Sequence, residues 1–316
     1  MSAGESPTPP GPGPEPPTPA GEIIEFADPL VEQICAANWG DGTGITPTQA
    51  AAVTDIGVVF NNKAITSFDE FGTYFTSVTS IRGHASQTSQ QAFYNCTSLK
   101  SITVPASVTE IGAFAFRGCS SLEAFTLPAT VLTVGQSVFF SCTGLKELRI
   151  NRDIYTTQIS STNNDVGDGT GLLFVDGDLT QSAGAPRLNF NTVHITGDVP
   201  QSSGNNVLLN SNYVEKVIID GNVSRSYTLV SGTNIKFLEL GGTYNFMLLP
   251  SGGTNIIAHL KYNGVAGTPT NIRIAAVSKV YVDSQAVLNQ YLADSNWSQY
   301  SSKLDLWANY NGDYRE

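Results

Sequence analysis

Charged side chains are scarce in this sequence, where lysine, arginine, aspartate and glutamate together make up 14% of 316 residues. Acidic residues outnumber basic ones by 27 to 16, which gives a formal net charge of −11. Such a negative field repels a phosphate backbone, so the composition argues against a nucleic-acid partner.

Long apolar runs are also missing. No stretch approaches the roughly 18 consecutive apolar residues that a membrane-spanning helix needs, and the first residues lack the basic and apolar blocks of a signal peptide. We therefore expect no transmembrane segment, although an export signal or a lipid-anchor cysteine upstream of residue 1 stays open. Residues 1–22 are so rich in proline and glycine that we expect a semi-extended tether, with an unstructured tail as the alternative.

Signatures of catalysis and of metal binding are lacking as well. The chain has only three histidines, and no serine elbow, zinc-binding helix motif or phosphate loop occurs. The glycine-rich loop 38–49 has Asp41 as its only carboxylate and Gln49 where a calcium loop requires glutamate. We expect no enzyme, no cofactor and no metal site.

What the sequence does contain is an internal repeat. Three segments, residues 91–112, 114–135 and 137–150, align at a spacing of 23. Each carries phenylalanine, cysteine and leucine at equivalent places, followed by two apolar residues in period-2 alternation, which indicates a short strand with one buried face. The equivalent residues are Phe93, Phe116 and Phe139; Cys96, Cys119 and Cys142; Leu99, Leu122 and Leu145; and the pairs Ile102/Val104, Phe125/Leu127 and Leu148/Ile150.

The same strand pattern persists after the phenylalanine and cysteine signatures end. Successive copies start 20 to 24 residues apart, with an earlier copy at Val78/Ile81 and a degenerate copy near Leu173/Val175. Because each coil buries its apolar edge only by stacking on its neighbours, the pattern predicts one solenoid of about ten coils. The later copies are Phe190/Val193/Ile195, Val214/Val217/Ile219, Ile235/Leu238/Leu240, Ile257/Leu260/Tyr262 and Val277/Val280/Val282.

The pattern AFxxCxSLxxIxxPxxVTxIG in residues 91–150 is similar to the BspA-like leucine-rich repeats of Bacteroides-type bacterial surface proteins. The resemblance implies a leucine-rich-repeat solenoid that is β-rich with short helical caps. It also implies a protein at the cell surface or outside the cell, as an outer-membrane lipoprotein or a secreted protein. The later coils match only the strand core of the pattern.

Both flanks of the repeats predict helices. Asp28 followed by Pro29 predicts a helix start, and Thr46 to Gln49 and Ser67 to Glu70 are spaced as capping boxes. A helix capped by Asp283 or Ser284 should end near residue 294, with Val287 and Tyr291 covering the last coil. We expect the tether at 1–22, a helical cap at 23–77, the solenoid at 78–282, and a C-terminal helical cap and tail at 283–316.

The cysteines favour burial over pairing. Equivalent side chains in a stack point the same way, and three cannot pair evenly, so Cys96, Cys119 and Cys142 should form a row of buried free thiols. Cys35 falls on the expected first helix and should lie in the core. No cluster with zinc-ligand spacing includes any of them.

Outward strand positions are the best functional surface that the pattern offers. They are small and polar in the first coils, whereas the later coils present aromatic, histidine and lysine side chains, in which binding energy tends to concentrate. The candidate binding residues are Thr192, His194, Lys216, Phe237, Glu239, His259, Lys261 and Tyr281.

We expect a non-enzymatic binding or adhesion protein that presents this face to a protein or glycan partner. One alternative is a structural or virion component, such as a phage subunit built from the same repeats. The other is a carbohydrate-active enzyme using Asp220 and Glu239, which would require the two acids to converge in a cleft.

Overall fold

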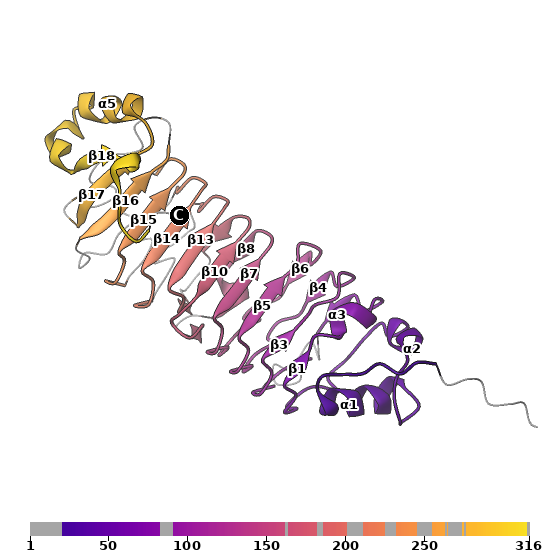
Figure 1. Cartoon of the computed structure of the whole chain (residues 1–316). Coiled ribbons are helices and arrows are strands. Elements are labelled where there is room, and N and C mark those ends of the chain that lie inside the picture. Colours follow the sequence, from indigo (N-terminus) through magenta and orange to yellow (C-terminus); the bar gives the residue numbers. More distant parts are fainter. Residues whose placement is uncertain are drawn as a thin grey trace, which may run out of the picture.

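The chain forms an elongated stack of parallel β-coils with helices at both ends (Figure 1). The computed structural model describes residues 21–82, 91–161, 164–181, 186–200, 211–224, 232–244, 255–262, 264, 274 and 276–314. The expected leucine-rich-repeat solenoid is confirmed. The predicted tether lies outside the described residues except for its last two, Gly21 and Glu22.

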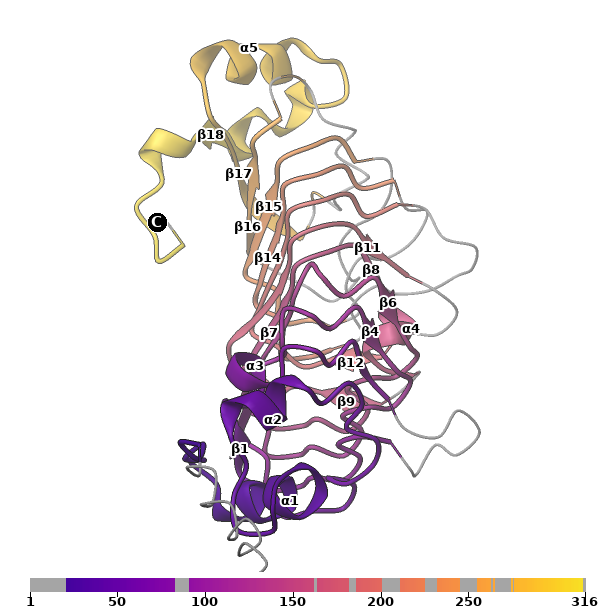
Figure 2. The same cartoon turned by 90° about the vertical axis from the view of Figure 1, so that its right-hand side faces the viewer.

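One parallel sheet runs along most of the molecule, in the order β18-β17-β16-β15-β14-β13-β10-β7-β5. Figure 2 shows this sheet on one side of the coils and the returning segments on the other. We call the surface that the sheet turns away from those returns the outward face. The strands are β5 (Ala124–Leu127), β7 (Glu147–Ile150), β10 (Leu172–Val175), β13 (Thr192–Ile195), β14 (Lys216–Ile219), β15 (Phe237–Leu240), β16 (Ile256–Leu260), β17 (Val277–Val282) and β18 (Leu304–Leu306).

Shorter strands complete the first coils and the returns. On the sheet side, β1 (Ser67–Phe68) pairs with β3 (Ser101–Ile102). A three-stranded sheet on the return side contains β2 (Ser80–Ile81), β4 (Glu110–Ile111) and β6 (Thr133–Val134). The remaining return elements are β8 (Ile154–Tyr155) paired with β11 (Leu179–Thr180), β9 (Asp165–Val166) paired with β12 (Arg187–Leu188), and the turn of helix α4 (Thr156–Ile159).

Alternation along each long strand decides what is buried. Leu148 and Ile150 of β7 are fully buried, and Leu173 and Val175 of the degenerate copy on β10 are fully buried as well. The parallel register places these pairs directly opposite each other. The apolar edges therefore form the continuous core that the repeat pattern predicts.

Two of the expected strand positions are wrong. Val78 and Ile81 belong to the return side, because β2 pairs with β4, and the sheet-side strand of that coil is β1. On β16 the inward residues are Ala258 and Leu260, which lie opposite Leu238 and Leu240. Ile257 points outward and Tyr262 is 38% exposed, because the neighbouring strand fixes the register and the apolar character of the side chains does not.

The phenylalanine and cysteine signatures form two ladders inside the first coils. Phe93 stacks on Phe116 with ring centroids 5.1 Å apart and planes 4° apart, and Phe116 stacks in turn on Phe139. The thiol of Cys119 donates to the carbonyl of Phe93 in the preceding coil, at 3.2 Å. All four cysteines are buried and free, so the expected thiol row and the burial of Cys35 are confirmed.

Helices cover the ends of the stack. Helix α1 (Pro29–Trp39) is capped by Asp28, and α2 (Pro47–Ala51) begins with the capping box that Thr46 and Gln49 predict. The box expected at Ser67 to Glu70 is wrong, because Ser67 and Phe68 are recruited into β1 and the short helix α3 (Phe71–Tyr74) starts after them.

At the C-terminal end, helix α5 (Gln285–Ala293) is capped by Ser284, as the sequence predicts. Its residues Val287 and Tyr291 are buried and cover the last coil. The chain then forms two 3-10 helices, η1 (Ser298–Lys303) and, after β18, η2 (Trp307–Asn309).

Candidate binding face

Parallel register aligns the outward side chains in rows that cross the strands. The row in the middle of the sheet, which we call the central row, consists of residues that lie directly opposite one another on neighbouring strands. Its members are Thr126, Arg149, Phe174, His194, Ile218, Glu239, His259 and Tyr281. The order of the coils in the sequence therefore sets the order of side-chain types along the outward face.

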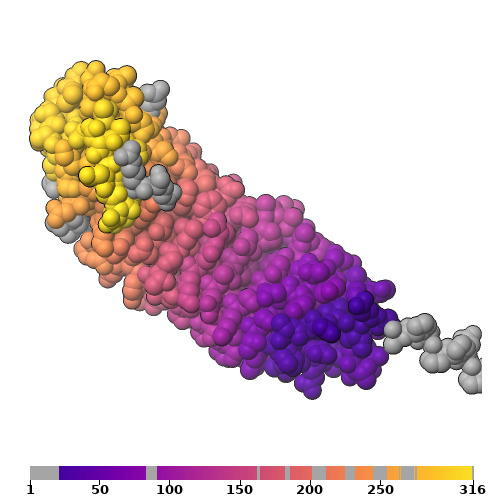
Figure 3. Space-filling view, viewed as in Figure 1, coloured from indigo at the N-terminus to yellow at the C-terminus, as the bar shows by residue number. Residues whose placement is uncertain are grey.

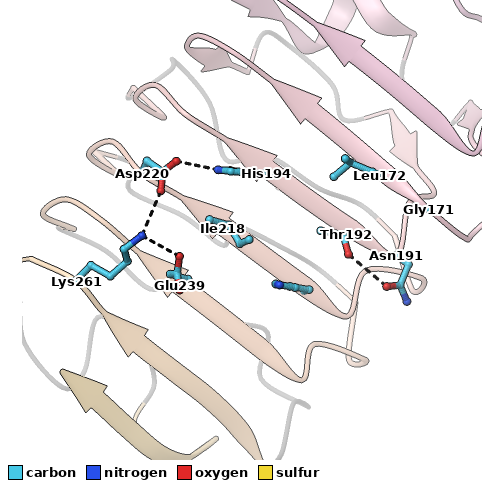
Figure 4. A pocket seen from close by; sticks show the side chains of 10 residues that line it. Gly171, Leu172, Asn191, Thr192, His194, Ile218, Asp220, Glu239 and Lys261 are labelled. Atoms are coloured by element: carbon cyan, nitrogen blue, oxygen red, sulfur yellow. Dashed lines mark hydrogen bonds and ion pairs between the residues drawn. The ribbon is translucent and has the colours of Figure 1, made fainter. Parts of the chain in front are cut away.

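A hollow of about 580 Å³ lies on the outward face between β10 and β16. Figure 4 shows side chains from successive strands converging on it. Its walls combine apolar, hydroxyl, amide, basic and acidic groups, so the hollow offers both contact area and directional hydrogen bonds. The lining residues are Gly171, Leu172, Asn191, Thr192, His194, Lys216, Ile218, Asp220, Glu239 and Lys261.

A chain of polar contacts organises the charged groups of the hollow. His194 Nε2 lies 2.8 Å from Asp220 Oδ2, and Lys261 Nζ lies 3.9 Å from the other oxygen of Asp220. The same ammonium donates to Glu239 Oε1 at 3.2 Å (Figure 4). Each link joins side chains from different coils, so the network fixes the charge pattern of the face.

His259 extends this network beyond the hollow and is itself buried, with 3% of its surface exposed. Its Nδ1 lies 2.7 Å from Glu239 Oε2, and its Nε2 lies 2.7 Å from Asp283 Oδ1. An ionised carboxylate only accepts hydrogen bonds, so both ring nitrogens donate when the imidazole is protonated. The indole of Trp307 stacks on the ring at 4.0 Å with planes 9° apart.

These contacts determine the direction in which the pKa values of Glu239 and Lys261 shift. Burial acts to raise the pKa of Glu239, but the hydrogen bond from His259 and the charge of Lys261 outweigh it, so the pKa lies below its ordinary value. Burial acts to lower the pKa of Lys261, and the charge of Glu239 and its neighbouring carboxylates raises it overall. Both groups are therefore held in their ionised forms near neutral pH.

Five of the eight sequence-predicted residues line the hollow: Thr192, His194, Lys216, Glu239 and Lys261. The other three, Phe237, His259 and Tyr281, do point outward, but their expected exposure is wrong. They are 1%, 3% and 8% exposed because the C-terminal segment after β18 lies over them.

Sequence reasoning missed the residues that cover the face, Trp307, Tyr310 and Tyr314. Phe237 and Tyr314 stack at 5.0 Å, and Tyr281 meets Tyr310 at 5.1 Å. The available signal was the recurrence of aromatic residues three and four positions apart in an otherwise small and polar tail. Asp220, considered from the sequence only as a possible catalytic acid, also faces outward. It directly follows the inward residue Ile219 at the end of β14, so the alternation of the strand already indicates this.

The fold is a β-solenoid of the leucine-rich-repeat class, with one long parallel sheet along its side. Within it, residues 63–164 match the family model of the BspA type leucine rich repeat region, in six copies. The resemblance seen in residues 91–150 is thus confirmed, and the coils from β10 onward lie outside the match.

No curated protein matches the chain. Among the helices that the structure describes, none has the length and apolar character needed to cross a membrane. Repeats of the BspA type are typical of surface and binding proteins.

Proposed function

We propose that this chain is a non-enzymatic binding protein that recognises a protein or glycan partner through the outward face between β10 and β17. One observation carries the proposal: the hollow of the later coils is lined by Lys216, Lys261 and His194 beside two acids and two apolar side chains, whereas the hollow of about 340 Å³ over the first coils has Asp69 as its one charged residue. Mixed charge beside apolar surface on a rigid scaffold supports specific recognition.

The ionic contacts support binding over catalysis by paired acids. Glycoside hydrolysis by two carboxylates needs one of them protonated near neutral pH. Glu239 has a lowered pKa, and Asp220 and Glu239 both lie against the ammonium of Lys261. Glu239 therefore lacks the surroundings of a proton donor.

We also propose that the protein is located at the cell surface or outside the cell. The BspA-type match of residues 63–164 supports it, and a proline- and glycine-rich segment such as 1–22 suits a spacer between an anchor and a binding domain. Attachment through a lipid anchor upstream of this chain is part of the proposal.

The test begins with a screen of host-cell and bacterial surfaces and of a glycan array, using the full chain. Against the best ligand, Lys216→Glu should weaken binding by about tenfold or more, which corresponds to about 1.4 kcal/mol. Lys100→Glu makes the same charge change at an exposed site outside the hollow and should leave affinity unchanged. Equal affinities for the two variants would remove the hollow as the recognition site.

A further inference from the structure

The segment that follows β18 lies on the outward face of the solenoid. In Figure 3 these C-terminal residues, drawn in yellow, rest against the neighbouring coils, and in Figure 2 they lie on the side of the sheet away from the returns. We call residues 307–314 the arm. The arm covers part of the surface whose uncovered part forms the hollow.

Three aromatic side chains anchor the arm to the outward face. Trp307 stacks on His259, Tyr310 packs edge-on against Tyr281, and Tyr314 stacks on Phe237 with planes 20° apart. Between the rings, the arm residues Ala308, Asn309, Asn311, Gly312 and Asp313 are exposed. The arm is therefore held on the face as a bound peptide is held, by a few anchor side chains in an otherwise solvated segment.

The three rings of the arm meet three neighbouring strands. Trp307, at the start of the 3-10 helix η2, stacks on His259 of β16, and Tyr310 meets Tyr281 of β17. The chain then turns back, so that Tyr314 reaches Phe237 of β15. Because neighbouring strands lie about 4.8 Å apart, one short segment with three rings spans three coils of the sheet.

Covered and uncovered parts of the face are continuous. A second hollow, of about 320 Å³, is walled by Trp307 and Tyr314 of the arm and by His259 and Asp283 of the solenoid. It shares Lys216, Ile218, Glu239 and Lys261 with the larger hollow. A ligand that fills the larger hollow therefore meets the edge of the arm.

We propose that the arm is a self-ligand, occupying in cis the end of a groove that takes a short polypeptide segment of the partner. That segment carries aromatic residues three or four positions apart among small polar residues, as Trp307, Tyr310 and Tyr314 are spaced. The inference rests on the proposed function, since it names the partner class for the same face. Binding of the partner displaces the arm and uncovers Phe237, His259 and Tyr281.

The probe is a fluorescently labelled peptide with the sequence of residues 307–314, followed by polarisation. The receptor is the full chain with Trp307→Ala and Tyr314→Ala, which frees the groove. We expect saturable binding with a Kd below about 0.1 mM, and binding at least about tenfold weaker to the unchanged chain, because its tethered arm competes at millimolar effective concentration. Adding Phe237→Ala to the receptor, or replacing the three peptide rings by alanine, should abolish binding.

Circular dichroism and thermal melting establish that each receptor is folded. If the double variant does not fold, Tyr314→Ala alone serves as the receptor. Because Trp307 stays stacked on His259, only the Phe237 site is freed, so the result required is stronger peptide binding than to the unchanged chain, lost again on adding Phe237→Ala.

Equal binding to the unchanged chain, or no saturable binding to a folded variant at about 1 mM, overturns the self-ligand. So does a variant that gains affinity on the glycan array and none for the peptide. The peptide assay needs no natural partner, so its result is separate from the Lys216→Glu test. The groove can be confirmed while the hollow fails as the recognition site, and the reverse holds equally.

Discussion

Between residues 91 and 150 the coils repeat every 23 residues and share phenylalanine and cysteine ladders, whereas the coils on β13 to β17 are 20 to 24 residues apart and share only alternating aliphatic residues. The family match stops at residue 164, yet one sheet runs through both regions. The family signature therefore describes how the interior and turns are filled, while the sheet itself requires only alternation and stacking.

The two regions also differ on their outward faces. Ala124 and Thr126 of β5 are exposed, whereas the corresponding positions on β15 and β16 hold Phe237 and His259, buried beneath the arm. Because the scaffold is the same, the difference lies wholly in the side chains that the later coils carry and in what covers them.

The largest expected effect on stability comes from breaking the phenylalanine ladder of the first region. Phe116→Ala removes a ring packed between Phe93, Phe125 and Phe139, and should lower the free energy of unfolding by about 3–5 kcal/mol through lost burial and a cavity. Urea unfolding followed by circular dichroism measures it. Phe174→Ala, at a partly exposed outward position, is the control and should cost about 1 kcal/mol. Similar costs for both would mean that the ladder is not a special source of stability.

The next effect compares two positions in the central row. His259→Ala removes the bridge between Glu239 and Asp283 and its stack on Trp307, and should cost on the order of 3 kcal/mol. Thr126→Ala, at the exposed position of the same row on β5, should change the free energy of unfolding by less than about 0.5 kcal/mol. A small loss at His259 would show that the arm leaves this part of the face open in solution.

A smaller effect depends on pH. Glu239→Gln should cost about 1.5 kcal/mol at pH 7, because it removes a charged hydrogen-bond acceptor for His259 and Lys261. The pKa of Glu239 lies below its ordinary value of 4.5, so the carboxylate stabilises the folded chain above pH 4.5, and this contribution is lost as the pH falls below it. The difference between the two proteins should therefore shrink as melts are repeated from pH 7 down to pH 3. Its persistence at pH 3 would argue against an ionic cause.

The smallest effect concerns the thiols of the first region. Cys119→Ala should cost about 1 kcal/mol, in proportion to the small apolar side chain removed. Burial raises the pKa of Cys96 to about 12 and that of Cys119 well above its ordinary value, so neither thiol is ionised at pH 8. Thiol titration should find both unreactive in the native chain and reactive in denaturant. Rapid native labelling would mean that the first coils open readily.

Much of the scaffold could be predicted from local patterns. Repeat spacing gave the solenoid, alternation gave the inward pairs on most strands, and caps such as Asp28 and Ser284 gave the helix starts. The errors fell where neighbours override local preference: Ser67 enters a strand because β3 offers it a partner, and Ala258 faces inward because Leu238 lies opposite.

The sequence alone determined which side of each long strand faces the core in nearly every coil, because a period of two is a property of consecutive residues. It also determined that charge and rings gather on the later coils. The tertiary structure decided which of those residues are exposed to solvent and which are buried. The bridge from Glu239 through His259 to Asp283, and the arm laid over Phe237, join side chains that the chain itself separates by whole coils. Burial depends on such distant contacts, so no local pattern could reveal it.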